Sequence, residues 1–299
     1  MPRVAIVTDS TSDLPADLRE RLGITMVPLN VHFGSDVFRD QVDITTDQFM
    51  VRLGQSSKLP TTSQPSAGLF EETFRALAAD HDGVVAVLIS AKLSGTVQSA
   101  TIARDAVADV VPVEIVDSFS ASMALGLQVM RAAELAAEGL AAPAIAERLR
   151  AEVGSYEIVF FVDTLEYLQR GGRIGKAAAF VGGLLNLKPL LRVDEGQVVP
   201  FERTRTRARA IQGVVDFARG LPAVDRLSVI YSSVRADAEA LADRLAAELN
   251  LKRDEIVVAQ MSPVIGTHVG PGAMGVAIAE GAAGEVTSPP SAGTSAARR

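Results

Sequence analysis

The sequence has no cysteine and only three histidines among its 299 residues. The lack of cysteine excludes disulfide bonds, thiolate zinc sites, iron–sulfur clusters and cysteine nucleophiles. With so few histidines we also expect no dense histidine metal site. We predict no metal, and we also expect no cofactor.

Long uncharged hydrophobic runs and an excess of positive charge are also missing. Residues 123–146 are rich in Ala and Leu but include Arg131, Glu134 and Glu138, whereas a membrane-spanning helix needs about 20 nearly all-apolar residues. The apolar run in residues 1–9 is too short for a signal peptide. A net charge of −7 disfavours a nucleic-acid partner, because such binding depends on Lys and Arg. We expect a cytoplasmic protein without stable membrane insertion.

The remaining composition supports one or two hydrophobic cores, since 48% of the residues are hydrophobic. Short β-branched runs indicate buried strands at residues 4–7, 84–89 and 113–116. Between and after them, apolar residues recur at helical spacing in residues 69–79, 97–107 and 123–137. Strands that alternate with helices are typical of βαβ units. We therefore predict an α/β protein whose N-terminal domain has a parallel, Rossmann-like sheet.

The second half of the chain has a different pattern. Residues 190–193 and 198–201 flank a turn and predict a β-hairpin. Strands are also expected at residues 227–231 and 255–259, and a last strand contains Met274, Val276 and Ile278. This pattern favours a C-terminal α/β domain with a mixed sheet. We predict domains at residues 1–160 and 161–281, followed by a disordered tail at residues 282–299.

Polar residues follow three of the predicted N-terminal strands. They lie at residues 8–13, at Ser90 with the segment 94–96, and at Asp117 with Ser118. In an open parallel sheet, ligands bind beyond the carboxyl ends of the strands. We therefore expect the ligand site at this edge.

Ser94 and Gly95 lie at the start of a predicted helix. Backbone N–H groups there lack helical partners, and the helix dipole favours a carboxylate or a phosphate. Gly95 would let a ligand atom approach the backbone, and the Ser94 hydroxyl adds a donor. Ser94 as a simple helix cap explains the same pattern.

Two further segments offer polar groups to a ligand. The polar loop at residues 58–66 includes Thr62, whose hydroxyl could close over a ligand, while Ser66 suits a helix cap. His268 lies in a Gly- and Pro-rich loop at residues 266–272, where little apolar surface is available for it to join. Its imidazole could donate a hydrogen bond or pair with an anion, and a structural role remains equally open.

Two further features of the sequence each allow two interpretations. Arginine recurs at every second position, at residues 203, 205, 207 and 209, which fits a docking patch or an ordinary charged helix start. Residues 177–187 are nearly uncharged and fit either the lining of an apolar tunnel or plain core.

Five segments, in this order, resemble the DegV family of bacterial fatty-acid-binding proteins. They are VTDSTSDLP at 7–15, TSQPS at 62–66, LSGT at 93–96, LQRGGRI at 168–174 and HVGPG at 268–272. The resemblance spans about residues 4–280. It implies a two-domain protein that holds one long-chain fatty acid between its domains. It also implies a non-catalytic role: the acid is presented to an ATP-dependent fatty-acid kinase, and the protein then carries the acyl phosphate for phospholipid synthesis.

The resemblance assigns roles to particular residues. Thr62, Ser94 and His268 correspond to the family's carboxylate ligands, with Gly95 beside Ser94. Arg205 corresponds best to an arginine that docks the kinase, although Arg203 fits almost as well. As candidates for lining the acyl tunnel we take residues of the uncharged segment, namely Phe180, Val181, Leu184 and Leu185.

Other functions are less well supported by the residues. A serine hydrolase with Ser94 as nucleophile and His268 as base lacks the Gly-x-Ser-x-Gly elbow, and no particular acid is marked as its third member. A nucleotide-using kinase lacks a Gly-x-x-x-x-Gly-Lys-Ser/Thr loop. A DNA-binding regulator conflicts with the acidic balance.

Overall fold

A four-stranded parallel sheet forms the core of the N-terminal half in the computed structural model, which describes residues 2–181 and 187–281. Its strand order is β2-β1-β6-β7. The strands are β2 (Ile24–Val27), β1 (Val4–Asp9), β6 (Gly83–Leu88) and β7 (Val113–Asp117). All six residues of β6 are buried, as expected for a strand covered on both faces. The predicted parallel sheet is confirmed.

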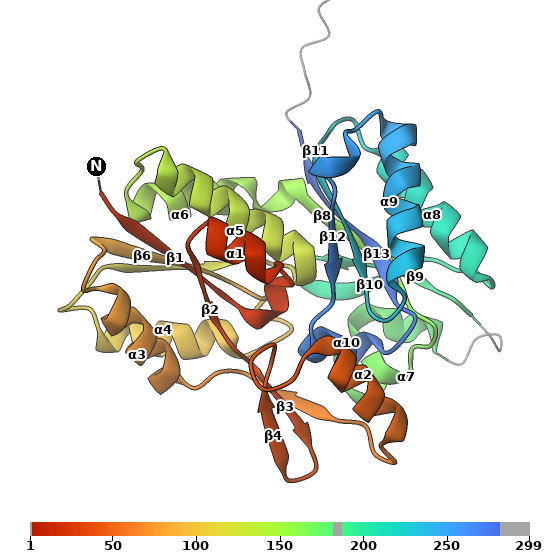
Figure 1. Ribbon diagram of the computed structural model, residues 1–299, viewed down its shortest axis with the longest axis horizontal. Helices are drawn as coiled ribbons and strands as arrows, with labels where there is room; N and C mark the ends of the chain where they lie inside the picture. The colour runs from red at the N-terminus through yellow and green to blue at the C-terminus, as the bar shows by residue number, and fades with distance from the viewer. Residues whose placement is uncertain (1, 182–186, 282–299) are drawn as a thin grey trace, which may run out of the picture.

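Helices cover both faces of this sheet (Figure 1). One face packs against α3 and α4 through Phe70, Phe74 and Ala100. The other face packs against α5 and α6. The helices of this half are α1 (Ala16–Arg21), α3 (Ala67–Leu77), α4 (Thr96–Ala106), α5 (Ser122–Ala137) and α6 (Ala142–Glu152), with 3₁₀ turns η1 (Ser10–Ser12) and η2 (Val153–Ser155).

A six-stranded mixed sheet forms the core of the C-terminal half, with strand order β10-β9-β8-β13-β11-β12. Among the strands of this sheet that the structure describes, β11 and β12 alone pair in parallel, so the predicted mixed sheet is confirmed. The strands are β8 (Tyr156–Phe161), β9 (Leu190–Asp194), β10 (Gln197–Glu202), β11 (Val224–Tyr231), β12 (Val257–Gln260) and β13 (Met274–Glu280). The predicted hairpin and last strand correspond to β9–β10 and β13. Helices α8 (Arg207–Gly220) and α9 (Arg235–Leu249) cover one face, and the 3₁₀ turns are η3 (Gly175–Phe180) and η4 (Arg253–Glu255).

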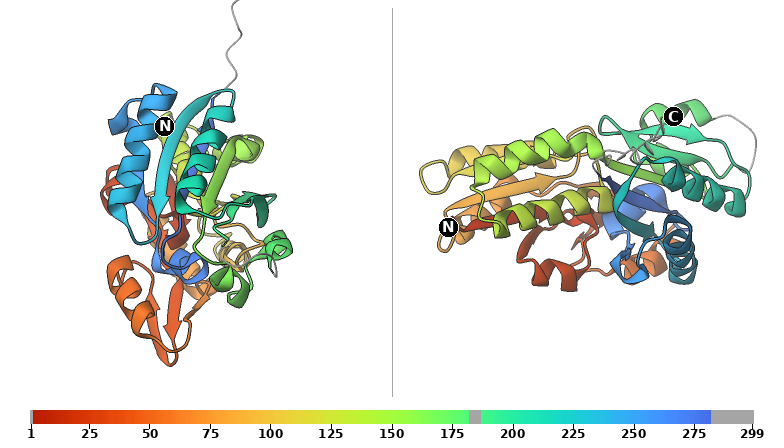
Figure 2. Two further views of the ribbon diagram at one scale, coloured as in Figure 1. Left: turned by 90° about the vertical axis from the view of Figure 1, so that its right-hand side faces the viewer. Right: turned by 90° about the horizontal axis from the view of Figure 1, so that it is seen from above.

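Helix α5 lies between the two sheets and joins them (Figure 2). Eleven of its 16 residues are buried, because it packs against the parallel sheet on one side and against β8, β11 and β13 on the other. One continuous core therefore includes Ile6 and Val85 of the first sheet and Phe160 and Ile230 of the second. The predicted boundary at residue 160 falls inside β8 and stays a prediction, and the predicted tail lies outside the described residues.

A small third sheet, which the sequence did not reveal, extends from the first half. It has the antiparallel order β4-β3-β5, with β4 (Asp36–Arg39), β3 (Asn30–Phe33) and β5 (Thr61–Ser63). Helices α2 (Thr46–Gln55) and α10 (Pro263–Val269) pack beside it, and α7 (Glu166–Arg170) contacts α10. Phe49 and Val264 share this core, so the small sheet ties both halves of the chain together.

We predicted a loop at residues 266–272, and this prediction is wrong for residues 266–269. Residues 266–269 belong to helix α10, which Ser262 caps by accepting a hydrogen bond from the Ile265 backbone N–H. Pro263 at the first turn favours this helix start. Within the described ranges, no helix combines the length and the apolar character that crossing a bilayer requires.

Candidate functional site

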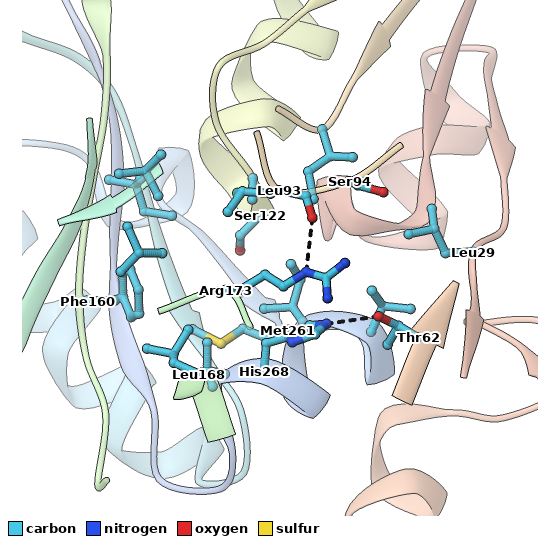
Figure 3. A pocket seen from close by; sticks show the side chains of 18 of the residues that line it. Leu29, Thr62, Leu93, Ser94, Ser122, Phe160, Leu168, Arg173, Met261 and His268 are labelled. Carbon is cyan, nitrogen blue, oxygen red and sulfur yellow. Dashed lines mark hydrogen bonds between the residues drawn. The ribbon is translucent and has the colours of Figure 1, made fainter. Parts of the chain in front are cut away.

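A cavity of about 770 Å³, counting its open mouth, lies between the two halves of the molecule. Residues from both sheets line it, including Ile89 after β6 and Phe160 of β8. Its lining is mostly apolar, with a few polar side chains: Thr62, Ser63, Gln64, Ser94, Ser122, Arg173 and His268. Thr62, Arg173 and His268 lie together on one side of the cavity, and Phe160 lies toward the other (Figure 3). The cavity thus joins a polar end to an apolar interior.

His268 and Thr62, which are 206 residues apart in sequence, are hydrogen-bonded at this polar end. His268 Nε2 lies 2.9 Å from Thr62 Oγ1. Helix α10 carries the histidine, and β5 carries the threonine as part of the small sheet. The packing of α10 against β3 and β5 brings these two residues together.

His268 is held in its neutral form. Burial and the positive charge of Arg173 lower the pKa of His268 to about 4. Nδ1 is buried without a hydrogen-bond partner among the described residues. Because a buried N–H without a partner is rarer than an unpaired acceptor, we assign the proton to Nε2. Nε2–H then donates to Thr62 Oγ1, and the Thr62 hydroxyl proton is left to donate to a ligand.

Gly171 makes room for the histidine ring. A Cβ atom at Gly171 would lie 2.2 Å from His268 Nδ1, closer than non-bonded atoms can approach. The first glycine of the Arg-Gly-Gly-Arg segment therefore lets the imidazole pack against the backbone at the C-terminal end of α7.

Arg173 is a site residue that we did not identify from the sequence. Its Nε donates to the carbonyl oxygen of Leu93 at 3.1 Å and its Nη1 donates to the carbonyl oxygen of Gly171 at 2.7 Å. No carboxylate within the described part of the chain pairs with it. It lies between the segment of Ser94 and the pair Thr62–His268 (Figure 3). A fixed guanidinium there favours an anionic ligand.

Ser94 lines the cavity and does not cap the helix that follows. Gly95 is the N-cap of α4, and the Ser94 hydroxyl lies 2.8 Å from the Thr96 hydroxyl. A Cβ at Gly95 would lie 3.0 Å from the side-chain nitrogen of Gln64. The glycine therefore allows the Gln64 side chain to pack closely against the start of α4. Ser66, in contrast, does cap α3 by accepting a hydrogen bond from the Leu69 N–H.

The structure brings Thr62, Ser94 and His268 to one cavity but not the tail-lining candidates. Phe180 packs against the core, with the guanidinium of Arg203 4.7 Å from its ring centroid. Val181 is 42% exposed, and Leu184 and Leu185 lie outside the described residues. The residues that line the apolar interior come mainly from sheet strands and α10: Ile158, Phe160, Val193, Val198, Ile230, Val264, Ile265 and Val269.

The arginine-rich segment divides into two parts. Helix α8 begins only at Arg207, so Arg203 and Arg205 precede it and are exposed. Arg207 pairs with Asp237 at 2.8 Å and donates to the Gly272 carbonyl oxygen. Arg207 thus has a structural role, and Arg205 faces solvent.

Several acids of the predicted polar edge hold the backbone behind the cavity. Asp9 accepts hydrogen bonds from the backbone N–H groups of Thr11 and Ile89. Asp13 accepts from Ser122 Oγ at 2.6 Å and from the Ser262 N–H at 2.9 Å, so it joins the starts of α5 and α10. Burial raises the pKa of Asp9, and it raises that of Asp13 to about 7. Within the described residues, no three His, Asp or Glu side chains are grouped to hold a metal.

Comparisons with known proteins identify the family. The model of the DegV family, described as "Uncharacterised protein, DegV family", matches residues 3–281. A DegV domain-containing protein of Streptomyces coelicolor is 42% identical over 92% of this chain and 98% of its own length. Protein DegV of Bacillus subtilis is 36% identical over 91% of this chain and 98% of its own length.

Solved structures show the same fold. A DegV family protein from Thermus thermophilus, whose structure is described as showing fatty acid binding, has 40% identity and a TM-score of 0.84 over 93% of this chain and 99% of that one. A stearic-acid-binding protein from Eubacterium ventriosum has 28% identity and a TM-score of 0.86 over 94% of this chain and 98% of that one. By its sequence over nearly its whole length and by its fold, this chain belongs to the DegV family.

Proposed function

We propose that this protein binds one long-chain fatty acid in the cavity between its halves. The observation that carries the proposal is the division of the cavity into a small polar end and an apolar interior. A fatty acid has the same division, with one carboxylate and a long hydrocarbon tail. The relatives from Thermus thermophilus and Eubacterium ventriosum, described as binding a fatty acid and stearic acid, support the assignment.

The carboxylate is proposed to lie against Thr62, Ser94 and His268, with Arg173 beside them. The hydroxyl groups of Thr62 and Ser94 donate hydrogen bonds to the carboxylate oxygens. Neutral His268 keeps the Thr62 proton directed toward the ligand, because Nε2–H occupies the Thr62 lone pair. The fixed guanidinium of Arg173 offsets the ligand's charge in this partly buried place. No metal is required for this recognition.

Native mass spectrometry of the purified protein tests the proposal. We expect a bound mass equal to that of a fatty acid with a long chain. Ser94→Ala is expected to raise the dissociation constant for added fatty acid about tenfold, the usual effect of losing one hydrogen bond to a charged group. Ser99→Ala, on the same helix but outside the cavity, is the matched control. Protein without bound lipid from several hosts, and without binding of added fatty acid, would refute the proposal.

We further propose that the protein presents the carboxylate to an ATP-dependent fatty-acid kinase in the cytoplasm and then carries the acyl phosphate. In that reaction a carboxylate oxygen forms a bond to the γ-phosphorus of ATP held by the kinase. The bond from that phosphorus to the β–γ bridging oxygen breaks, and ADP leaves. Arg205 is the proposed docking residue, supported by its exposure before α8 and by the family resemblance.

Arg205→Ala is expected to lower phosphorylation of the bound fatty acid by tenfold or more, on the order expected for a charged contact at an interface. Fatty-acid occupancy should stay unchanged, because Arg205 does not line the cavity. Arg203→Ala is measured in parallel, since Arg203 is also exposed, and Arg148→Ala on α6 is the control. The readout is acyl phosphate formed with the kinase and ATP. A loss of occupancy in Arg205→Ala would contradict the docking role.

The alternative of a serine hydrolase gains no support from the geometry. A nucleophilic serine needs a hydrogen bond to its base, and the base needs an orienting acid. Here His268 Nε2 is bonded to Thr62, Ser94 is bonded to Thr96, and His268 Nδ1 has no partner among the described residues. The hydrogen bonds Thr62–His268 and Ser94–Thr96 fit ligand binding better than nucleophilic attack.

A further inference from the structure

A second hollow, which we call the outer basin, adjoins the polar end of the cavity. It is lined by residues 57–62 and by residues of α7, the segment after α7, and α10. Thr62, Arg173 and His268 line both the outer basin and the apolar cavity. These three residues therefore form the wall between the apolar interior and an outer compartment with a mixed polar and apolar lining.

The outer basin is positively charged. Three of its 12 lining residues are basic, namely Lys58, Arg170 and Arg173, and none is acidic. Lys58 has no ion pair within the described ranges, and Arg170 pairs with Glu166 at 3.0 Å. Arg173 has only backbone carbonyl partners. In a chain of net charge −7, such a local cluster attracts anions to this place.

The position of the outer basin relative to the carboxylate indicates which anion it takes. A carboxylate at the wall, with its tail in the apolar cavity, directs its oxygens toward Thr62, Arg173 and His268. A group attached to one of these oxygens has to extend away from the tail, and the outer basin is the space on that side. The acyl phosphate of the proposed function has such a group, with up to two negative charges.

We propose that the outer basin is the subsite for the phosphoryl group of an acyl phosphate, with Lys58 and Arg170 as its cationic ligands beside Arg173. This inference rests on the proposed function, because it places the second anionic group of the same ligand. Lys58 and Arg170 line the outer basin only, whereas Thr62, Arg173 and His268 line both spaces. Lys58 therefore contributes to holding the phosphorylated lipid and contributes little to holding the free acid.

Equilibrium binding of two ligands with equal chains tests the subsite. Hexadecyl phosphate, a stable phosphate monoester, serves as the probe, and hexadecanoic acid serves as its partner. Lys58→Gln is expected to weaken hexadecyl phosphate binding about tenfold, as for one charge-assisted contact, and to change hexadecanoic acid binding less than twofold. Arg170→Gln should act in the same direction. Lys176→Gln removes an exposed lysine that lines neither space and should change neither affinity.

The outcomes separate this inference from the proposed function. If hexadecanoic acid binds and Lys58→Gln affects both ligands equally or neither, the phosphate subsite is refuted and fatty-acid binding stands. If the unaltered protein binds neither ligand, the proposed function itself is refuted, and the subsite with it. Thermal unfolding of each variant shows whether it is folded, because Lys58 is exposed and its replacement should leave the melting temperature unchanged.

Discussion

Each methylene removed from the bound fatty acid is expected to weaken binding by about fourfold, as long as that methylene lies in the apolar interior. The factor follows from about 0.8 kcal/mol per buried methylene. From 16 to eight carbons, the loss would be roughly 10⁴- to 10⁵-fold. This is the largest effect we expect, because the polar end offers only a few hydrogen bonds while Ile158, Phe160, Ile230 and their neighbours surround the tail. Calorimetry or competition with a fluorescent fatty acid measures the series.

The same series separates the contributions of tail and head. The primary alcohol of each chain length keeps the tail and removes the carboxylate, so it should show the same slope per methylene with a constant offset. A slope near zero for the acids would mean that the tail lies outside the cavity. An absent offset would mean that Thr62, Ser94, Arg173 and His268 do not distinguish a carboxylate from a hydroxyl group.

The parallel sheet and its helices were predictable because local sequence determines them. Strand β6 is a Val-rich run whose six residues are all buried, β1 is buried at five of its six residues, and Phe70 and Phe74 lie one turn apart on α3. The edge strand β7 is buried at only two of its five residues, but its β-branched residues still mark it as a strand. The small sheet was not predictable, since β5 has only three residues and depends on pairing with β3, some 30 residues earlier. Helix α10 was not predictable either, because Gly266 is typical of a loop. The Ser262 cap and packing against α2 stabilise the helix in spite of this glycine.

The candidate site was predicted in part. Thr62, Ser94 and His268 were candidates from their local sequence, the family resemblance assigned them as carboxylate ligands, and the structure places all three on one cavity. Arg173 was missed because its role depends on the carbonyl of Leu93, 80 residues earlier. Phe180 and Val181 were proposed for the lining because their segment is uncharged, but apolar composition does not separate core or exposed positions from a cavity wall. The residues that line the cavity come mainly from strands and from α10, and only the fold defines which of their faces point inward.

Two buried carboxyl groups near the junction of the halves are expected to contribute less and less stability as the pH rises from about 4 to about 8. Burial raises the pKa of Asp40 to about 8 and that of Asp13 to about 7. In the unfolded chain an aspartate has a pKa near 3.9. Below about pH 4 both states are protonated, so the contribution of the protonated form is fully present. It is lost as the pH rises through the folded-state values, at up to about 1.4 kcal/mol per pH unit for each group.

Asp40→Asn should remove the part of the pH-dependent decrease in the free energy of unfolding that comes from Asp40. The variant should therefore be more stable than the unaltered chain at pH 8. Both oxygens of Asp40 are buried without a hydrogen-bond partner among the described residues, so a neutral amide avoids the cost of a buried charge. Urea unfolding at several pH values between 5 and 8.5 measures the effect, and Asp80→Asn at an exposed position is the control. If the free energy of unfolding decreases with pH equally in Asp40→Asn and in the unaltered chain, Asp40 does not hold a proton in the folded state. If the prediction holds, the buried carboxyl of Asp40 keeps its proton in the folded protein well above the pH at which an aspartate of the unfolded chain loses it.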